Sequence, residues 1–441
     1  HRVIIHVKED PEIIKLRMDP DARRGTLCDD ISCEGGFDDI AWSEDSEQLV
    51  FVSTSRDHKE ENIRIANTQT GEVKDIFEEV VETQYESGQG GINWRYFSKT
   101  NEIIWYSERT DWGHLYMYDA TTGKVKNSIT SGEYVVRNIL NIDEENRMIY
   151  FVGSHHEGKG NPYFSYLYAV KFNGKGLKML TPEIAHHAVR LSPNGEYFTD
   201  SYSQPDVPAV HNVRNIKGKL ISTLEKTDVS RLKATGWKPP TTFTVKSAQG
   251  EWDLYGLMYT PTEMKPDTKL PVIVYIYPGP QGGSVGSWSF SASRRDNQAL
   301  AELGFVVVQL EGSCNPDRSK SFHDACYGNM GENTLSDQIS GLKQLQTKYS
   351  FLDLDNIGIW GHSGGGFATA AAMFKYPDVF KVGISESGNH DNRNYEDDWG
   401  ERYIGLETMD GNGVSNYEKQ ANQVFAKDLK GKLLIIHRGM L

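Results

Sequence analysis

The sequence predicts two domains of different class: a partial β-propeller of about four blades, then an α/β domain with a mostly parallel, doubly wound sheet. At 441 residues the chain is longer than one ordinary domain. A pattern of short strands repeats through its first half, which is typical of propeller blades. In its second half, apolar runs alternate with helical patterns, which is typical of a parallel sheet covered by helices. We therefore expect domains over residues 1–235 and 236–441.

The composition narrows the possible partners and cofactors. The net charge is −14 with 24% charged and 38% hydrophobic residues, as in globular proteins. There is no dense Lys/Arg block, so we expect no nucleic-acid partner. No apolar run approaches a membrane span. The cysteines contain no CxxC motif, so we predict no metal or cofactor, and expect buried thiols or at most a local pair; they are Cys28, Cys33, Cys314 and Cys326.

The repeat in the first half has the length of a propeller blade. Trp42, Trp94, Asn141 and Ser192 occupy corresponding points in four units, roughly 50 residues apart. Each unit has an alternating strand, a polar turn, an aromatic-rich strand and a third strand that leads to a Gly-containing hairpin. A β-sandwich with coincidental spacing is the alternative. Four blades do not comfortably close a ring, and the chain opens on His1 without an initiator methionine, so we expect blades to precede it.

The second half begins after the linker Pro239-Pro240. Short, fully apolar runs indicate buried parallel strands, and helical patterns at 294–303 and 334–349 lie between them. Ligands of such sheets bind beyond the carboxyl ends of the strands. The apolar runs end at Tyr277, Leu310, Trp360, Ser385 and His437.

One serine stands just past such a strand end. The segment Gly361-His362-Ser363-Gly364-Gly365 follows an apolar run and precedes a helical pattern. A serine on a sharp strand-to-helix turn presents its hydroxyl above the sheet as a nucleophile, and the next backbone N–H can stabilise an oxyanion. We therefore predict that Ser363 is catalytic; the alternative is a structural turn serine.

Several further motifs resemble one family. "YGLMYTP", "PVIVYIYPGPQGG", "IWGHSGGG", "VFKVGISESGNHD" and "ERYIG" occur in the order and spacing of the dipeptidyl peptidase IV branch of the prolyl oligopeptidase superfamily. "SERTDWGHLYMYD" with "TSGEYVV" resembles one of its propeller blades. The resemblance covers nearly the whole chain and implies a β-propeller followed by an α/β-hydrolase domain.

The resemblance implies roles for particular residues. Ser363 matches the nucleophile, the N–H of Gly364 one oxyanion donor, and the hydroxyl of Tyr277 the other. Tyr395 and Trp399 match aromatic positions of the pocket for the residue before the cleaved bond. Tyr277 could instead cap the core, and the two aromatics could be plain packing. We expect Glu401 and Arg402 of "ERY" to form a structural ion pair.

The chain departs from the family pattern at the rest of the catalytic triad. The family aspartate follows the strand that "KLLIIH" matches, but the sequence there reads from His437 to Leu441 without an Asp, and no triad histidine follows. Neither His437 nor His362 stands at the position of the base. We therefore expect a chain that is C-terminally truncated and nearly inactive in this form.

Other positions also depart from the pattern or have a structural interpretation. Ser313 stands where the family has an arginine, and Glu78-Glu79 is not a convincing counterpart of the amine-anchoring acidic pair. The histidine pairs His155-His156 and His186-His187 are expected to be surface residues of blade loops.

The resemblance implies a serine peptidase that releases Xaa-Pro or Xaa-Ala dipeptides from the N-termini of oligopeptides. It also implies a secreted or periplasmic enzyme, and it allows a homodimer of the full-length protein. The alternatives are an acylaminoacyl-peptidase or esterase on the same scaffold, and a non-catalytic binding protein that uses its propeller as an interaction surface.

Overall fold

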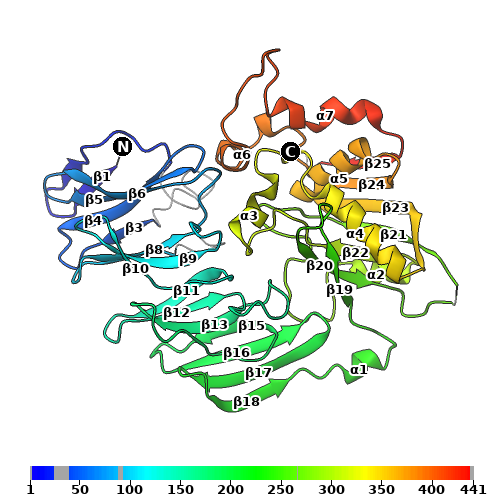
Figure 1. The fold of residues 1–441 in the computed structure, drawn as a ribbon, viewed down its shortest axis with the longest axis horizontal. Helices are drawn as coiled ribbons and strands as arrows, with labels where there is room; N and C mark the ends of the chain where they lie inside the picture. The colour runs from blue at the N-terminus through cyan, green and yellow to red at the C-terminus, as the bar shows by residue number, and fades with distance from the viewer. Residues whose placement is uncertain (1, 24–38, 88–92, 266, 438–441) are drawn as a thin grey trace. The chain divides into compact units, whose positions relative to one another are not determined.

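The computed structural model describes residues 2–23, 39–87, 93–265 and 267–437 (Figure 1). The chain forms two compact units that are not contiguous in sequence. Unit 1 comprises His1–Gly158, Leu167–Met179 and Asp397–Leu406. Unit 2 comprises Lys159–Tyr166, Leu180–Glu396 and Glu407–Leu441. Each unit is described on its own.

The predicted repeats fold as four-stranded sheets, in which strands that follow one another in sequence are neighbours. A two-stranded antiparallel sheet, β1 (Val3–His6) and β2 (Glu12–Lys15), precedes them. The first repeat contains β3 (Ile40–Trp42), β4 (Gln48–Thr54), β5 (Glu60–Asn67) and β6 (Val73–Val80). The second contains β7 (Arg95–Phe97), β8 (Glu102–Ser107), β9 (His114–Asp119) and β10 (Val125–Ser128).

The third and fourth repeats have the same order of strands. The third contains β11 (Val136–Asp143), β12 (Met148–Gly153), β13 (Tyr166–Lys171) and β14 (Lys178–Met179). The fourth, in unit 2, contains β15 (His186–Leu191), β16 (Tyr197–Gln204), β17 (Val207–Asn215) and β18 (Leu220–Lys226). These four sheets agree with the predicted blades.

Aromatic residues form much of the core between the first two blades. Trp105 is fully buried, stacks on Tyr85 with ring centroids 5.3 Å apart, and meets Phe77 edge-on. The indole N–H of Trp105 donates to Glu79 at 2.7 Å, and Arg109 donates to the same carboxylate at 3.0 Å. Glu79 therefore has a structural role in this core, since its charge is paired inside the blade.

Two of the four blade histidines were wrongly expected at the surface. His155 and His187 are 7% and 3% exposed, and His186-His187 lies within β15, not in a loop. The imidazole Nδ1 of His187 lies 2.7 Å from Asp200 Oδ1, and the other carboxylate oxygen of Asp200 accepts from Arg214 Nε at 2.9 Å. His187 lies on the same face of β15 as Val189 and Leu191, but its burial depends on a polar network that joins other strands, which the sequence of this strand does not show.

The second half forms the predicted, mostly parallel sheet with strand order β19-β20-β22-β21-β23-β24-β25. Only the pairs that involve β19 and β20 are antiparallel among its described strands. The strands are β19 (Thr241–Lys246), β20 (Asp253–Tyr259), β21 (Leu270–Tyr275), β22 (Val306–Leu310), β23 (Leu352–His362), β24 (Phe380–Glu386) and β25 (Lys432–Ile436). The α-helices of the described residues are α1 (Ser230–Lys233), α2 (Asn297–Glu302), α3 (Lys320–His323), α4 (Leu335–Lys348), α5 (Gly364–Lys375), α6 (Asp397–Ile404) and α7 (Asn422–Phe425). The two helices expected at 294–303 and 334–349 correspond to α2 and α4.

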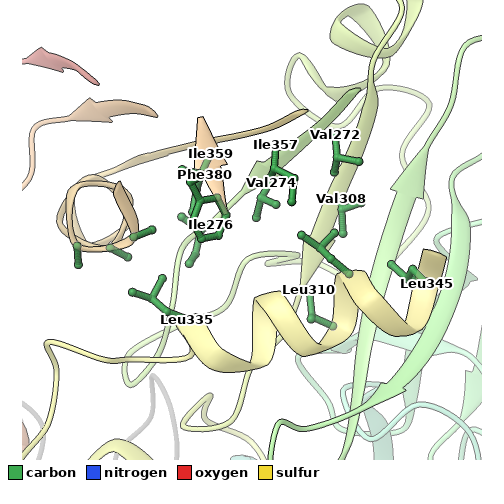
Figure 2. Close-up of a cluster of buried hydrophobic side chains, with 14 of the residues drawn as sticks. Val272, Val274, Ile276, Val308, Leu310, Leu335, Leu345, Ile357, Ile359 and Phe380 are labelled. Carbon is green, nitrogen blue, oxygen red and sulfur yellow. The ribbon is translucent and has the colours of Figure 1, made fainter. Parts of the chain in front are cut away.

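The core of unit 2 lies between the central strands and the helices α4 and α5. Strand residues such as Val274, Ile276 and Ile359 meet helix residues such as Leu335 and Leu345, and all are at most 2% exposed (Figure 2). Gly341 lets α4 approach the sheet, because a Cβ there would lie 2.6 Å from Leu310. This packing fixes the carboxyl ends of β21 and β23, where the candidate site lies.

Candidate functional site

Ser363 occupies the sharp turn between β23 and α5. Its backbone has φ 56° and ψ −120°, a conformation that residues with a Cβ rarely adopt. Its N–H donates to the carbonyl of Glu386 at 2.8 Å, and its own carbonyl accepts the first helical bond, from Phe367, at 3.0 Å. Hydrogen bonds to the sheet and to the helix therefore hold both ends of the turn. They keep Ser363 in its strained backbone conformation.

The glycines around Ser363 are required because backbone segments approach closely. A Cβ on Gly361 would lie 2.3 Å from the carbonyl oxygen of Ile276, and one on Gly365 would lie 2.2 Å from the same oxygen. A Cβ on Gly366 would lie 2.4 Å from the carbonyl oxygen of Glu386. The spacing Gly-x-Ser-x-Gly-Gly is thus dictated by strands β21 and β24 on either side of the turn.

This close approach brings Tyr277 to the turn. Tyr277 follows β21, and its Cα would lie 3.6 Å from a Cβ on Gly365. The amide of Gln281 donates to the Tyr277 hydroxyl at 3.4 Å, and a Cβ on Gly364 would lie 3.8 Å from the same amide nitrogen. The structure therefore gathers the loop of Tyr277 and the first turn of α5 around Ser363.

The arrangement can stabilise negative charge. The first N–H groups of an α-helix have no partner within the helix and lie at the positive end of its dipole. Gly364 begins α5, so its N–H is one of these donors. The Tyr277 hydroxyl is a neutral group that can also donate a hydrogen bond. Gln281 was not predicted from the sequence, because only the folded loop places its amide near the tyrosine hydroxyl.

Among the described residues, no side chain makes a hydrogen bond with the Ser363 hydroxyl. His362 is half-exposed, and its Nδ1 lies 3.5 Å from a carboxylate oxygen of Glu386. His437 follows β25 and is exposed. Burial and the nearby His437 lower the pKa of His390, which hydrogen-bonds Asn422 at 3.0 Å. None of these three histidines therefore makes a hydrogen bond with the Ser363 hydroxyl.

The predicted pocket aromatics fall in different compact units. Tyr395, in unit 2, is 39% exposed. Trp399, in α6 of unit 1, packs on Tyr403 with ring centroids 5.4 Å apart.

The expected ion pair of "ERY" is corrected by the structure, because each partner binds blade residues. Glu401 accepts from Arg23 at 2.9 Å and also pairs with Arg56. Arg402 donates to the carbonyl of Tyr85 at 3.0 Å and lies 3.4 Å from a carboxylate oxygen of Glu86. Both charged residues thus attach α6 to the blades within unit 1.

The loop after β22, where the family arginine is replaced, is ordered in another way. Ser313 donates from its N–H and hydroxyl to Asp337 at 2.8 and 2.6 Å. The adjacent Cys314 forms a disulfide with Cys326, which is the local pair that the sequence allowed. Cys28 and Cys33 lie outside the described residues.

One group of side chains in the described chain has the spacing of metal ligands: Glu183, His187 and Asp200. Arg214 binds both carboxylates, since its guanidinium donates to Asp200 and Glu183. The single positive charge of Arg214 therefore already pairs with both carboxylates, and its guanidinium would repel a cation at the same place. This group does not fit a metal site. No helix of the described residues is long and apolar enough to cross a membrane.

Family models match most of the chain. Residues 19–209 match the dipeptidyl peptidase IV N-terminal region, and residues 288–440 match the prolyl oligopeptidase family. Among curated relatives, human dipeptidyl peptidase 8 is 31% identical over 63% of this chain and 32% of its own length. Dipeptidyl peptidase 4 of Arthroderma otae is 29% identical over 78% of this chain and 45% of its own length. The chain thus spans less than half the length of these relatives.

Solved structures have the same fold. A structure assigned as a dipeptidyl aminopeptidase IV of Bacteroides ovatus superposes with a TM-score of 0.80 at 26% identity, over 97% of this chain and 60% of that one. Dipeptidyl peptidase 4 of Porphyromonas gingivalis superposes with a TM-score of 0.81 at 22% identity, over 97% of this chain and 57% of that one.

The class is defined by four-stranded, blade-like sheets and by a mostly parallel sheet with a serine in a sharp strand-to-helix turn: a β-propeller with an α/β-hydrolase domain. Within that class, the chain belongs to the dipeptidyl peptidase IV-like branch of the prolyl oligopeptidase family.

The strained turn leads to a test that needs no enzymatic activity. Glycine tolerates positive φ, whereas any residue with a Cβ at position 363 retains the strain. We expect Ser363→Gly to be more stable to urea unfolding than Ser363→Ala by about 1 kcal/mol, because relief of 1–3 kcal/mol of strain exceeds the added flexibility of the unfolded chain. Equal stability of the two variants, or a less stable Ser363→Gly, would contradict the strained turn.

Proposed function

We propose that the protein is a serine peptidase that releases dipeptides from the N-termini of oligopeptides, with Ser363 as nucleophile. The observation that carries this proposal is the turn itself: a serine at φ 56° between a parallel strand and a helix, with a tyrosine loop packed against it. A serine hydroxyl is a weak nucleophile elsewhere on a surface, and this geometry is the one that serine hydrolases use to expose it.

In the proposed reaction, Ser363 Oγ bonds to the carbonyl carbon of the peptide bond and a general base takes the hydroxyl proton. The carbonyl π electrons move to its oxygen, which accepts hydrogen bonds from Gly364 N–H and the Tyr277 hydroxyl. Collapse of this intermediate breaks the C–N bond, and the leaving amine takes the proton. Water then releases the dipeptide from the acyl-enzyme by the same steps.

The substrate class rests on the relatives and on the two aromatic residues. The curated relatives are named dipeptidyl peptidases. Tyr395 and Trp399 are proposed to line the pocket for the residue before the cleaved bond, since flat aromatic rings suit a proline ring and exclude long side chains. Release of Xaa-Pro or Xaa-Ala dipeptides is therefore the proposed activity. An acylaminoacyl-peptidase would instead prefer N-acylated amino acids as substrates, and an esterase would prefer simple esters.

The first test concerns the nucleophile. In protein expressed from the full reading frame, Ser363→Ala should abolish turnover of a Gly-Pro chromogenic substrate, because only binding and oxyanion stabilisation would remain. Initial rates of the variant and the wild type at equal concentration provide the measurement. Near-normal turnover by Ser363→Ala would sink the assignment.

The second test concerns the oxyanion tyrosine. Loss of one oxyanion donor costs about 2.7–4 kcal/mol of transition-state stabilisation, so Tyr277→Phe should lower kcat by roughly a hundredfold or more with little change in KM. The phenyl ring keeps the packing of the tyrosine, which makes the hydroxyl the only change. A rise in KM alone would assign Tyr277 to binding or packing.

The third test concerns the 441-residue polypeptide. Neither a triad Asp nor a triad His matches the family positions in its sequence, so we expect no labelling of Ser363 above background by a fluorophosphonate probe. The same probe on protein from the full reading frame is the comparison. Labelling of the 441-residue polypeptide that disappears in Ser363→Ala would show that another residue, such as His362 or His437, acts as the base.

A further inference from the structure

The loop that carries Tyr277 is held by polar side chains from the segment that follows β22. The N–H of Gly279 donates to Asn315 Oδ1 at 3.1 Å, and the carbonyl of Gly279 accepts from the amide of Asn333. The ring Nε2 of His323 lies 2.8 Å from the carbonyl oxygen of Pro280. Side chains therefore provide hydrogen-bond partners for the backbone of this loop, although the loop is not part of a strand.

A buried carboxyl lies behind the loop. Glu311, the first residue after β22, is 2% exposed. Its carboxyl oxygens accept from the N–H of Val285 at 3.0 Å and from the amide of Asn315. The backbone of Ser284 and Gly286 also lowers the pKa of this carboxyl, against the larger effect of burial. A Cβ on Gly283 would lie 2.2 Å from the carboxyl, so the loop backbone lies directly against it.

The partners of Glu311 suit one protonation state. Both groups that hydrogen-bond the carboxyl are N–H donors. A carboxylate is an acceptor only, whereas a protonated carboxyl must place one O–H among these donors. The hydrogen bonds therefore favour the charged form, although burial opposes it.

Asn315 connects this carboxyl to the tyrosine. Its amide nitrogen binds Glu311, and its amide oxygen binds the N–H of Gly279, two residues after Tyr277. A Cβ on Gly279 would lie 2.1 Å from the carbonyl oxygen of Cys314, so the two loops touch through their backbones. The disulfide of Cys314 with Cys326 closes the supporting segment.

We propose that Glu311, acting with Asn315, is a positioning residue that holds the Tyr277 loop in the geometry that oxyanion stabilisation needs. This inference rests on the proposed function, because it assigns a role to the support of the proposed oxyanion donor. Neither side chain touches the reacting atoms; both act through the backbone of residues 277–286.

The role predicts a specific pH dependence. Burial raises the pKa of Glu311 to about 7, and the N–H donors limit the rise. Because the ordered loop holds the carboxyl proton more tightly than water does, ionisation as the pH rises through about 7 should loosen the loop and lower its contribution to kcat. The same raised pKa means that stability is fully present below the ordinary carboxyl pKa and is lost as the pH rises through about 7. The contribution of the loop to activity and the stability should therefore fall together.

Other titratable groups near Glu311 can be separated from it. The phenols of Tyr163 and Tyr275 interact with its charge, but burial raises the pKa of both, so they stay neutral in this pH range. Asp317 and Arg318 interact electrostatically with Tyr163. His323 contacts the loop at the carbonyl of Pro280 and has an ionisable ring, so His323→Gln serves to isolate its contribution.

The activity test uses protein from the full reading frame. Glu311→Gln places an amide among the N–H donors, so we expect kcat to fall at least tenfold, KM to change less than twofold, and the contribution that is lost as the pH rises through about 7 to disappear. Asn315→Ala should lower kcat in the same direction while keeping the pH dependence. His323→Gln should keep the wild-type inflection. Glu302→Gln, which neutralises an exposed carboxylate on α2, is the matched control and should leave the kinetics unchanged.

A second measurement does not depend on catalysis. In the 441-residue polypeptide, amide hydrogen exchange should show protection of Gly279 and Val285 that is lost in Glu311→Gln and reduced in Asn315→Ala, but kept in Glu302→Gln. Unchanged protection in both Glu311→Gln and Asn315→Ala would overturn the inference, as would an unchanged pH profile in Glu311→Gln. Loss of protection in Glu311→Gln together with an inactive wild-type enzyme would support the role of Glu311 in the loop and refute the proposed function instead.

Discussion

The contact between the carbonyl oxygen of Ile276 and the two glycines Gly361 and Gly365 determines the geometry of the candidate site. A side chain at either glycine would overlap this oxygen, at 2.3 or 2.2 Å. Because the contact joins the end of β21 to the turn after β23, it fixes the tyrosine loop and the serine turn by one backbone approach. The buried strands beneath it make the approach rigid, since their side chains pack against α4 and α5 with almost no exposure. The site is thus positioned by the backbone and the core, and its polar side chains are placed upon them.

The sequence predicted the features that depend on local pattern. Strand alternation and turn residues predicted four-stranded sheets, and each of the four repeats forms one. Apolar runs predicted the parallel sheet, because strands buried on both faces contain few polar residues. The Gly-x-Ser-x-Gly spacing predicted the turn at Ser363, since close backbone approach is visible in sequence as glycine. Features that depend on short-range sequence patterns could therefore be predicted from the sequence alone.

The sequence did not predict features that join distant polar residues. His187, Asp200 and Arg214 are spread over three strands, and polar residues in a blade look like surface residues until they are seen buried. Glu401 and Arg402 are adjacent, which suggested a mutual pair, yet helical geometry points neighbours in different directions and each binds another blade residue. Glu311 and Gln281 were missed for the same reason: their importance depends on a loop conformation, not on a spacing. The roles of Tyr277, Tyr395 and Trp399 stay predictions.

The bond between Cys314 and Cys326 has a consequence for how the protein must be made. Disulfides form and persist where the surroundings are oxidising, whereas thioredoxin and glutathione keep thiols reduced in the cytosol of most cells. In a reducing compartment the segment after β22 would be closed only by its hydrogen bonds, and its two thiols would be buried beside Met330 and Phe322. The chain would then reach a native-like fold in which the segment that supports the Tyr277 loop is held less tightly. The choice of expression compartment is therefore a structural variable for this protein, and material from different hosts should be compared only after its thiols have been counted.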